Sequence, residues 1–133
     1  IPLIEQEAEK NGIEIRTDLD YSLSSSTLDP EQIRQVLLNI LLNSIQAMPD
    51  GGQLTIRSMQ DLNQAHTVVE VADTGPGASK EVLDHIFDPF FSTKPQGTGL
   101  GLSVSYQLVE QHGGTLSAHP NAEGGLTLRI ELP

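Results

Sequence analysis

Residues 29–52 constrain the fold more than any other part of the chain, because they carry the start and the stop of one long helix. Asp29 can cap a helix, and Pro30 suits the first helical position. The helix is predicted to run to about Met48, where the Pro-Asp-Gly-Gly sequence of residues 49–52 stops it. Side chains at helical spacing predict one buried stripe on this helix. They are Ile33, Val36, Leu37, Ile40, Leu41, Ser44 and Met48.

The rest of the sequence mixes strand patterns with shorter helices. Strands are predicted at residues 13–19, 53–59, 67–73, 115–119 and 126–132, and helices at residues 79–86 and 100–111. This order contains two hairpins. We therefore expect an α+β fold, a two-layer sandwich in which about three helices cover one face of a mixed, mostly antiparallel sheet of about five strands. At 133 residues the chain fits one domain, residues 1–133.

The net charge limits the partners that the chain can bind. With 7 Lys and Arg residues against 18 Asp and Glu residues, the charge is −11 at pH 7. This balance argues against binding to nucleic acid or to anionic lipid, both of which need a basic surface. A site for a polyanion would have to use backbone N–H groups, a metal ion and few cationic side chains. The absence of cysteine excludes disulfides and cysteine nucleophiles.

Two glycine clusters invite comparison with phosphate-binding loops. Residues 75–80 follow a predicted strand and precede a helix, but Lys80 stands where dinucleotide-binding loops have a third glycine. Residues 97–102 end in Leu102 instead of that glycine, and neither cluster contains the Gly-Lys-Ser/Thr of a P-loop. Taken alone, each cluster is more simply interpreted as a turn.

Three polar residues stand out against their surroundings. Asn39 and Asn43 are four residues apart on the predicted long helix, so their amides project from the same face. They are either solvated residues opposite the core stripe or an oxygen pair for a hard cation such as Mg²⁺. Asp73 ends a predicted strand before Gly75 and Gly77. Its carboxylate can form a turn, or it can accept a hydrogen bond from an amine in a pocket.

Five motifs in a fixed order carry a resemblance to a known family. They are Asn39 with Asn43-Ser44; Asp73-X-Gly75-X-Gly77; Ile86-Phe87-Asp88-Pro89-Phe90-Phe91-Ser92-Thr93-Lys94; Gly97-Thr98-Gly99-Leu100-Gly101-Leu102; and Gly124-Gly125-Leu126-Thr127 before Leu132-Pro133. Over residues 29–133 the chain resembles the catalytic, ATP-binding domain of sensor histidine kinases. That family lies within the Bergerat-fold ATPases, which include gyrase, heat-shock chaperones and mismatch-repair ATPases.

The resemblance implies a function for the domain. It would bind ATP with Mg²⁺ and transfer the γ-phosphoryl group to a histidine on a separate dimerisation domain, expected before residue 1. The activity would serve two-component signalling, with a response regulator as an indirect partner. The domain itself is expected in the cytoplasm without direct membrane contact, whether the full-length protein is membrane-bound or soluble.

The resemblance also implies roles for individual residues. Asp73 would accept the adenine amino proton, with Gly75 and Gly77 close under the base and Thr127 supporting the same edge. Asn43, and less directly Asn39, would hold Mg²⁺ at the phosphates. Lys94, one of three lysines, would be the cation of the ATP lid. The residues expected to contact phosphate through the second glycine box are Gly97, Thr98, Gly99, Leu100, Gly101 and Leu102. Asn39, Asn43 and Lys94 would be the catalytic residues.

The chain departs from the family pattern at two positions. Gln46 stands where many of these kinases have a lysine, so Lys94 would carry more of the phosphate contact. The terminal motif has Leu126 before Thr127, where two threonines are common. The chain's histidines lack the acidic neighbour of a phosphoacceptor, and we expect no self-phosphorylation of the fragment. They are His66, His85, His112 and His119.

The same fold also hosts functions other than histidine phosphorylation. An ATP hydrolase of the gyrase or chaperone type would use a glutamate base where this chain has Asn39, and an asparagine cannot take a proton from water at neutral pH. An anti-sigma serine kinase is a second possibility, and a non-catalytic, ATP-responsive docking module is a third. Of the three phenylalanines, Phe87 is expected in the local core, and Phe90 and Phe91 are expected to anchor the lid.

Overall fold

The computed structural model describes residues 2–18, 30–61, 66–88 and 101–133, and every structural statement below refers to these ranges. The elements in chain order are α1 (Pro2–Lys10), β1 (Ile13–Asp18), α2 (Pro30–Gln46), β2 (Gly52–Asp61), β3 (His66–Asp73), α3 (Lys80–His85), α4 (Gly101–Gln111), β4 (Thr115–Pro120) and β5 (Leu126–Leu132). Each strand and helix predicted from the sequence is therefore confirmed within the described ranges.

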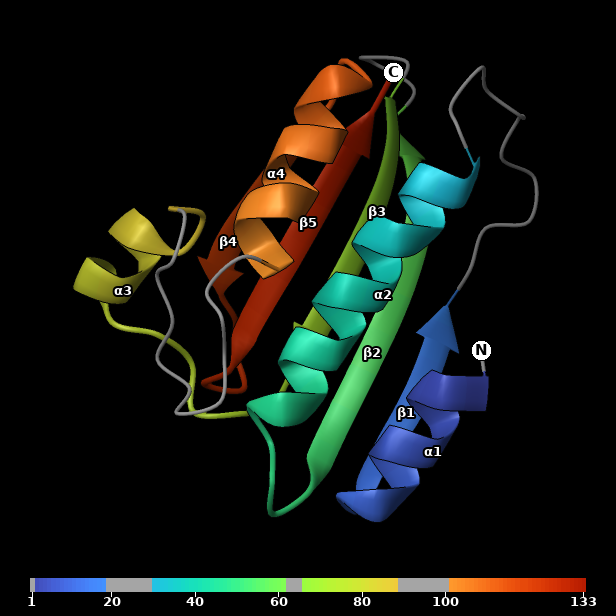
Figure 1. Cartoon of the computed structure of the whole chain (residues 1–133). Coiled ribbons are helices and arrows are strands. Elements are labelled where there is room, and N and C mark those ends of the chain that lie inside the picture. The colour runs from blue at the N-terminus through green and yellow to red at the C-terminus, as the bar shows by residue number, and fades with distance from the viewer. Residues whose placement is uncertain (1, 19–29, 62–65, 89–100) are drawn as a thin grey trace.

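The strands form one five-stranded sheet in the order β1-β2-β3-β5-β4. The β1–β2 pair is parallel, and the β2–β3, β3–β5 and β4–β5 pairs are antiparallel. In Figure 1, α1, α2 and α4 lie along one face of this sheet, and α3 stands apart beside it. The mixed, mostly antiparallel sheet covered on one face confirms the predicted α+β class.

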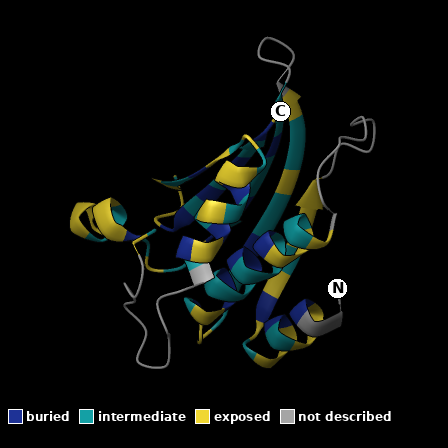
Figure 2. Ribbon diagram, turned by 45° about the horizontal axis from the view of Figure 1, so that its top comes forward, coloured by how far each residue is buried: buried dark blue, intermediate teal, exposed yellow. Residues whose placement is uncertain are grey.

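The core fills the space between α2, α4 and the inner face of the sheet (Figure 2). Strand β5 shows why the sheet has one buried face, because its residues alternate between buried and half-buried along the whole strand. From the predicted α2 stripe, Val36, Ile40, Leu41, Ser44 and Met48 are buried, and Ile33 and Leu37 are half-buried. Burial of one such aliphatic side chain contributes about 1.5–3 kcal/mol. Ile45, which the stripe left out, is 1% exposed.

Helix α2 ends at Gln46, two residues before the predicted end. The chain tightens there, because the backbone N–H of Met48 donates to the carbonyl of Ile45 at 3.0 Å in a 3₁₀ turn. Gly51 and Gly52 then reverse the chain with φ values of +102° and +150°, in the region that favours glycine. The turn places buried Met48 beside the end of β3.

Helix α1 was not predicted from the sequence. It is held by two buried side chains one turn apart, Ile4 and Ala8, and its remaining described side chains are exposed or half-buried. Asn11, just after the helix, donates from Nδ2 to the carbonyl of Ile45 at 3.3 Å. This bond attaches the first helix to the end of α2.

Two helix ends follow their sequence signals. Ser79 caps α3 by accepting a hydrogen bond from the Val82 N–H at 3.2 Å. Helix α4 stops before Gly113, whose φ is +80°. The predicted start of α4 at residue 100 lies outside the described residues. Among the helices of the described ranges, none has the length and apolar character needed to cross a membrane.

Candidate functional site

The C-terminal end of α2, the C-terminal end of β3 and the N-terminal end of α4 all point toward the same end of the molecule (Figure 1). Asp73 is the last residue of β3 and is only 5% exposed. Its Oδ1 accepts two backbone hydrogen bonds of 3.0 Å, from the N–H of Gly75 and from the N–H of Leu126. A carboxylate that accepts N–H groups in a buried position is strongly oriented. These two backbone N–H groups therefore fix the orientation of the Asp73 carboxylate.

The glycines after Asp73 are explained by close packing of the chain. A Cβ atom at Gly75 would lie 3.1 Å from Met48 Cγ and 3.3 Å from Asp73 Oδ1. Gly77 has a φ of +73°, and its Cβ would lie 2.6 Å from the carbonyl oxygen of Gly124. These contacts require small residues at both positions, whatever else binds there.

Thr74 ties the end of β3 to the start of β2. Its N–H donates to the carbonyl of Gln53 at 3.2 Å, and its Oγ1 accepts from the N–H of Gln53 at 3.0 Å. The hydroxyl also contacts Met48 Sδ at 3.8 Å. Asp73 is thereby held between two backbone anchors, one on the neighbouring strand β2 and one on β5.

Asn39 and Asn43 are both half-buried, on a face of α2 that packs against α4. Asn39 accepts a hydrogen bond at Oδ1 from Gln35 Nε2 at 3.0 Å and donates from Nδ2 to Ser105 Oγ at 3.5 Å. Ser105 is fully buried. Asn39 is therefore engaged by α4 and is not a solvated residue on the outer face.

Asn43 lies nearer to Asp73 along α2. It is one helical turn before Ala47, and a Cβ at Gly75 would lie 3.4 Å from the Ala47 carbonyl oxygen. Its amide oxygen is a hard donor of the kind that Mg²⁺ takes together with phosphate oxygens and water. The chemistry of this position thus fits a phosphate-bound Mg²⁺. Asn43 also interacts with the rest of the protein.

The N-terminal end of α4 points toward the same end of the molecule (Figure 1). Within the described residues the helix runs from Gly101, and Leu102 is half-buried. An α-helix N-terminus offers free N–H groups and the positive end of the helix dipole. The other predicted residues of the second glycine box and the lid lie outside the described residues: Lys94, Gly97, Thr98, Gly99 and Leu100, together with Phe90 and Phe91.

Thr127 lies on the opposite face of the sheet from the helices. It is the cross-strand partner of Ala72, and its neighbour Leu126 is buried toward the helices. Its Oγ1 accepts a hydrogen bond from Asn121 Nδ2 at 3.3 Å. The structure therefore brings Leu126 to the Asp73 carboxylate, and it does not bring the Thr127 side chain there.

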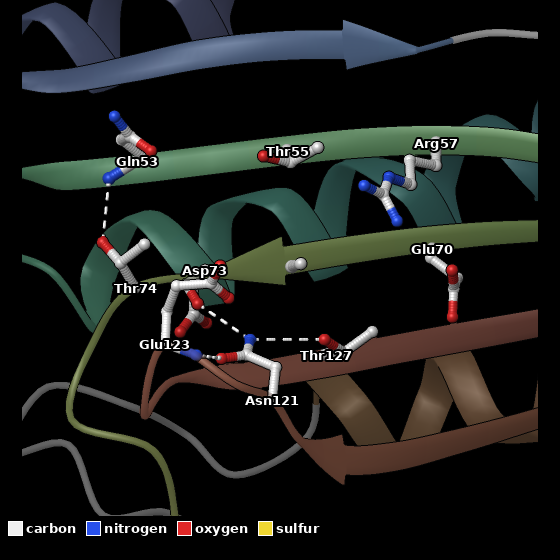
Figure 3. Close-up of a pocket in the computed structure, with 10 residues that line it drawn as sticks. Gln53, Thr55, Arg57, Glu70, Asp73, Thr74, Asn121, Glu123 and Thr127 are labelled. Atoms are coloured by element: carbon white, nitrogen blue, oxygen red, sulfur yellow. Dashed lines mark hydrogen bonds between the residues drawn. The ribbon is translucent and has the colours of Figure 1, made fainter.

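A polar pocket of about 300 Å³ opens on this uncovered face (Figure 3). Its lining residues are Gln53, Thr55, Arg57, Glu70, Ala72, Asp73, Thr74, Asn121, Glu123 and Thr127. In Figure 3 the sheet separates Thr55, Arg57, Glu70 and Thr127 from the helix behind it. Asp73 and Thr74 line this pocket at the end of β3, so the pocket adjoins the candidate site there.

Three histidines of the described ranges make local hydrogen bonds. His112 Nδ1 lies 2.7 Å from the Leu108 carbonyl at the end of α4, and His119 Nε2 lies 2.9 Å from Ser117 Oγ. His85 Nδ1 bonds Asp88 Oδ2 at 2.8 Å, and this hydrogen bond raises the pKa of exposed His85 above 6.5. These contacts agree with surface and capping roles.

Phe87 stacks on Tyr106 of α4, with ring centroids 5.2 Å apart and an angle of 28° between the rings. It also packs against the core. This confirms the prediction that Phe87 belongs to the local core.

Asn121, in the connection between β4 and β5, was not predicted as a site residue from the sequence. Its Nδ2 donates to the backbone carbonyl of Asp73 at 2.9 Å, across 48 residues of sequence. An asparagine before two glycines is a local signal for a turn. The contact with Asp73 could not be inferred from that signal, because it depends on how the strands pair.

Comparison with known proteins shows the family of this chain. Residues 28–133 match the family of histidine kinase-, DNA gyrase B- and HSP90-like ATPases. The whole chain aligns with the sensor histidine kinase ZraS of Escherichia coli strain K12 at 38% identity and covers 28% of that protein. The chain thus spans less than a third of the length of the curated relatives it matches.

Solved structures give the same result. The catalytic domain of the histidine kinase ThkA, in a nucleotide-free form, superposes with a TM-score of 0.86 at 34% identity, covering 99% of this chain and 86% of that one. Full-length ShkA in complex with AMPPNP superposes with a TM-score of 0.87 at 28% identity, covering 99% of this chain and 28% of that one. The chain belongs to the histidine kinase-, DNA gyrase B- and HSP90-like ATPase family, and its full length matches the catalytic domains of sensor histidine kinases.

Proposed function

We propose that this domain binds Mg-ATP and transfers the γ-phosphoryl group to a histidine on a separate dimerisation domain in two-component signalling. The observation that carries the proposal is the buried Asp73 carboxylate, oriented by two backbone N–H groups at the end of β3. Family membership supplies the reaction class, and the AMPPNP complex of ShkA makes an adenine nucleotide the ligand to test.

Asp73 would recognise the adenine base by accepting a hydrogen bond. A carboxylate has about four acceptor positions, so the two backbone bonds leave room for a third donor. The 6-amino group of adenine is such a donor. Guanine has a carbonyl oxygen at that position, and two acceptors facing each other would repel. We therefore expect selectivity for ATP over GTP.

The phosphates would lie between α2 and the N-terminal end of α4. Asn43 would give an amide oxygen to Mg²⁺, and the Gly101 end of α4 would offer backbone N–H groups. Lys94, Gly97, Thr98, Gly99 and Leu100 are proposed phosphate contacts from the sequence motif. Backbone donors and a metal ion suit a chain with a charge of −11, which has few cationic side chains to spare.

Catalysis by the domain would rest on positioning and charge neutralisation, because phosphoryl transfer needs little covalent help from the protein. Mg²⁺ would neutralise charge on the phosphates. The contribution of this chain is to orient the base at Asp73 and to hold the phosphate end near Asn43. The acceptor histidine and its proton-transfer partner would come from the dimerisation domain.

The hydrolase alternative finds no support at Asn39. That residue exchanges hydrogen bonds with Gln35 and Ser105, and its amide has no basic lone pair that could take a proton from water. A hydrolase base is therefore missing from the position where the gyrase-type enzymes have one.

Two measurements test the proposal. Calorimetry of the chain should show ATP binding that requires Mg²⁺, with GTP binding at least about tenfold weaker. Incubation with γ-labelled ATP should leave the chain unlabelled, and an acid-labile label should appear on an acceptor-domain protein added in trans. Equal affinities for ATP and GTP would contradict the role of Asp73. Phosphate release without a labelled acceptor would favour the hydrolase.

A further inference from the structure

Asn121 makes four side-chain hydrogen bonds in the connection between β4 and β5. Its Nδ2 donates to the backbone carbonyl of Asp73 at 2.9 Å and to Thr127 Oγ1 at 3.3 Å (Figure 3). Its Oδ1 accepts from the N–H of Glu123 at 3.1 Å and from the N–H of Gly125 at 3.0 Å. One half-buried amide thus joins the connection, strand β5 and the end of strand β3.

These bonds reach Asp73 by two routes. The amide N–H holds the Asp73 backbone carbonyl directly. The amide oxygen holds the N–H of Gly125, and the next residue, Leu126, donates its N–H to Asp73 Oδ1. The fit is close, since a Cβ at Gly125 would lie 2.6 Å from Asp73 Oδ1 and would overlap the Asp73 carbonyl oxygen. A small movement of this connection must therefore move the carboxylate or break its bond to Leu126.

The connection does not need the Asn121 side chain to stay closed. The backbone N–H of Asn121 donates to the Gly125 carbonyl at 3.1 Å, and the Gly124 N–H donates to the Asn121 carbonyl at 3.1 Å. Pro120 and Leu126, which flank the connection, are paired in the β4–β5 register. What the side chain adds is the attachment of this closed connection to β3.

We infer that Asn121 is a positioning residue for Asp73 and sets the precision with which the domain recognises the 6-amino group of adenine. The inference rests on the proposed function, in which Asp73 accepts that amino proton. It adds a residue outside the recognised motifs, on the outer face of the sheet, that acts on a carboxylate turned to the inner face. The Asn121 amide group donates to the β3 backbone and accepts from two N–H groups of the turn.

The experiment measures how strongly each variant prefers ATP over the triphosphate of purine riboside, which lacks the 6-amino group. Loss of a hydrogen bond of ordinary strength corresponds to about a threefold to tenfold weaker affinity. Asn121→Ala should weaken ATP binding by that factor and leave the affinity for the purine riboside triphosphate unchanged. A general structural defect would weaken both ligands equally.

Two further variants sharpen the test. Asn121→Asp keeps an acceptor for the Glu123 and Gly125 N–H groups but removes the donor to the Asp73 carbonyl, so it should lower the same preference. Glu123→Gln changes an exposed side chain of the same connection and should behave as the unaltered protein. Thermal unfolding of each variant checks that it is folded, and Asn121→Ser replaces the alanine variant if that one is not.

The outcomes separate this inference from the proposed function. A drop in preference with Asp73→Asn but none with the Asn121 variants would overturn the inference and keep the role of Asp73. An unchanged preference with Asp73→Asn would overturn the proposed function itself. An equal loss of both ligands with Asn121→Ala would overturn the inference by making Asn121 a structural residue. Support requires that Asn121→Ala have no further effect on the preference in the Asp73→Asn background.

Discussion

The backbone N–H of Leu126 donates a 3.0 Å hydrogen bond to Oδ1 of Asp73, which lies 53 residues earlier in the sequence. The bond crosses from the start of β5 to the end of β3, where the two strands are neighbours in the sheet. A second N–H, from Gly75, reaches the same oxygen. The orientation of this carboxylate therefore depends on the assembled sheet as well as on its local sequence.

Asp73→Asn should weaken ATP binding at least about tenfold, because a buried hydrogen bond to a charged group contributes about 1.5–3 kcal/mol. Calorimetry with Mg-ATP measures the change. Asp84→Asn is the matched control, since it removes the same charge from an exposed position on α3 and should leave the affinity unchanged. Equal affinities of the two variants would refute the assignment of Asp73.

Lys94→Ala should weaken ATP binding more than ADP binding if Lys94 contacts the γ-phosphate, as the sequence motif implies. The removed cation would interact with a phosphate that ADP lacks. Lys80→Ala removes a cation from the exposed start of α3 and should have little effect on either nucleotide. The comparison needs both nucleotides titrated under the same salt conditions, because exposed charges are screened by salt. Equal losses for ATP and ADP would argue against a γ-phosphate contact.

Gly77→Ala should destabilise the fold by about 2–4 kcal/mol, because it adds a steric contact and puts a side chain on a left-handed backbone that only glycine adopts without strain. Its Cβ would lie 2.6 Å from the Gly124 carbonyl oxygen, at a φ of +73°. Gly124→Ala separates the two causes. Gly124 has a φ of +84° and open space around its Cβ position, so only about 1 kcal/mol of backbone strain is expected. Chemical denaturation midpoints of the two variants should therefore differ clearly.

Ile40→Ala should lower the free energy of unfolding by about 2–5 kcal/mol, because it leaves a cavity between α2 and the sheet. Ile40 is fully buried in the core. Val104→Ala on α4, where the valine is 39% exposed, should cost less than about 0.5 kcal/mol. Similar costs for the two variants would mean that α2 is not packed as described.

His85 should titrate above 6.5, because its hydrogen bond to Asp88 favours the protonated ring. A pKa that is raised in the folded state stabilises the fold below the unfolded value, and this stabilisation is lost as the pH rises through the folded pKa. NMR titration of the ring should show the pKa falling back toward 6.5 in Asp88→Asn. Asp84→Asn, which removes only a weaker charge interaction, should move it less.

The regular parts of the fold could be predicted because their signals are local. The alternation of Leu126, Leu128, Ile130 and Leu132 gives the buried face of β5, and the Asp29 to Gly52 segment gives α2 within two residues of its observed end. Helix α1 gave no such signal, since Ile4 and Ala8 alone bury it. The predicted end of α2 lies two residues beyond the observed one, because the chain continues in a tight turn through Met48.

The candidate site was predictable only where residue types alone mark it. Asp73, Asn39 and Asn43 were found by motif, and the fold places Asn43 and Asp73 toward one end. The same alternation that buries Leu126 turns Thr127 to the outer face. The sequence motif alone does not show which of the two side chains faces the site. Asn121 has its partner 48 residues away, and only the pairing of β3 with β5 brings the two together.

The position of β5 between β3 and β4 has a consequence for how the domain matures. During translation the ribosome releases Asp73, Asn43 and the whole β2–β3 hairpin before it makes Leu126. Until β5 inserts beside β3, the carboxylate lacks one of its two N–H donors, and the β3 edge is open. Under the role proposed for Asp73, a nascent chain therefore holds Asn43 and Asp73 before its carboxylate is fully oriented for adenine, and that orientation arrives with the insertion of β5.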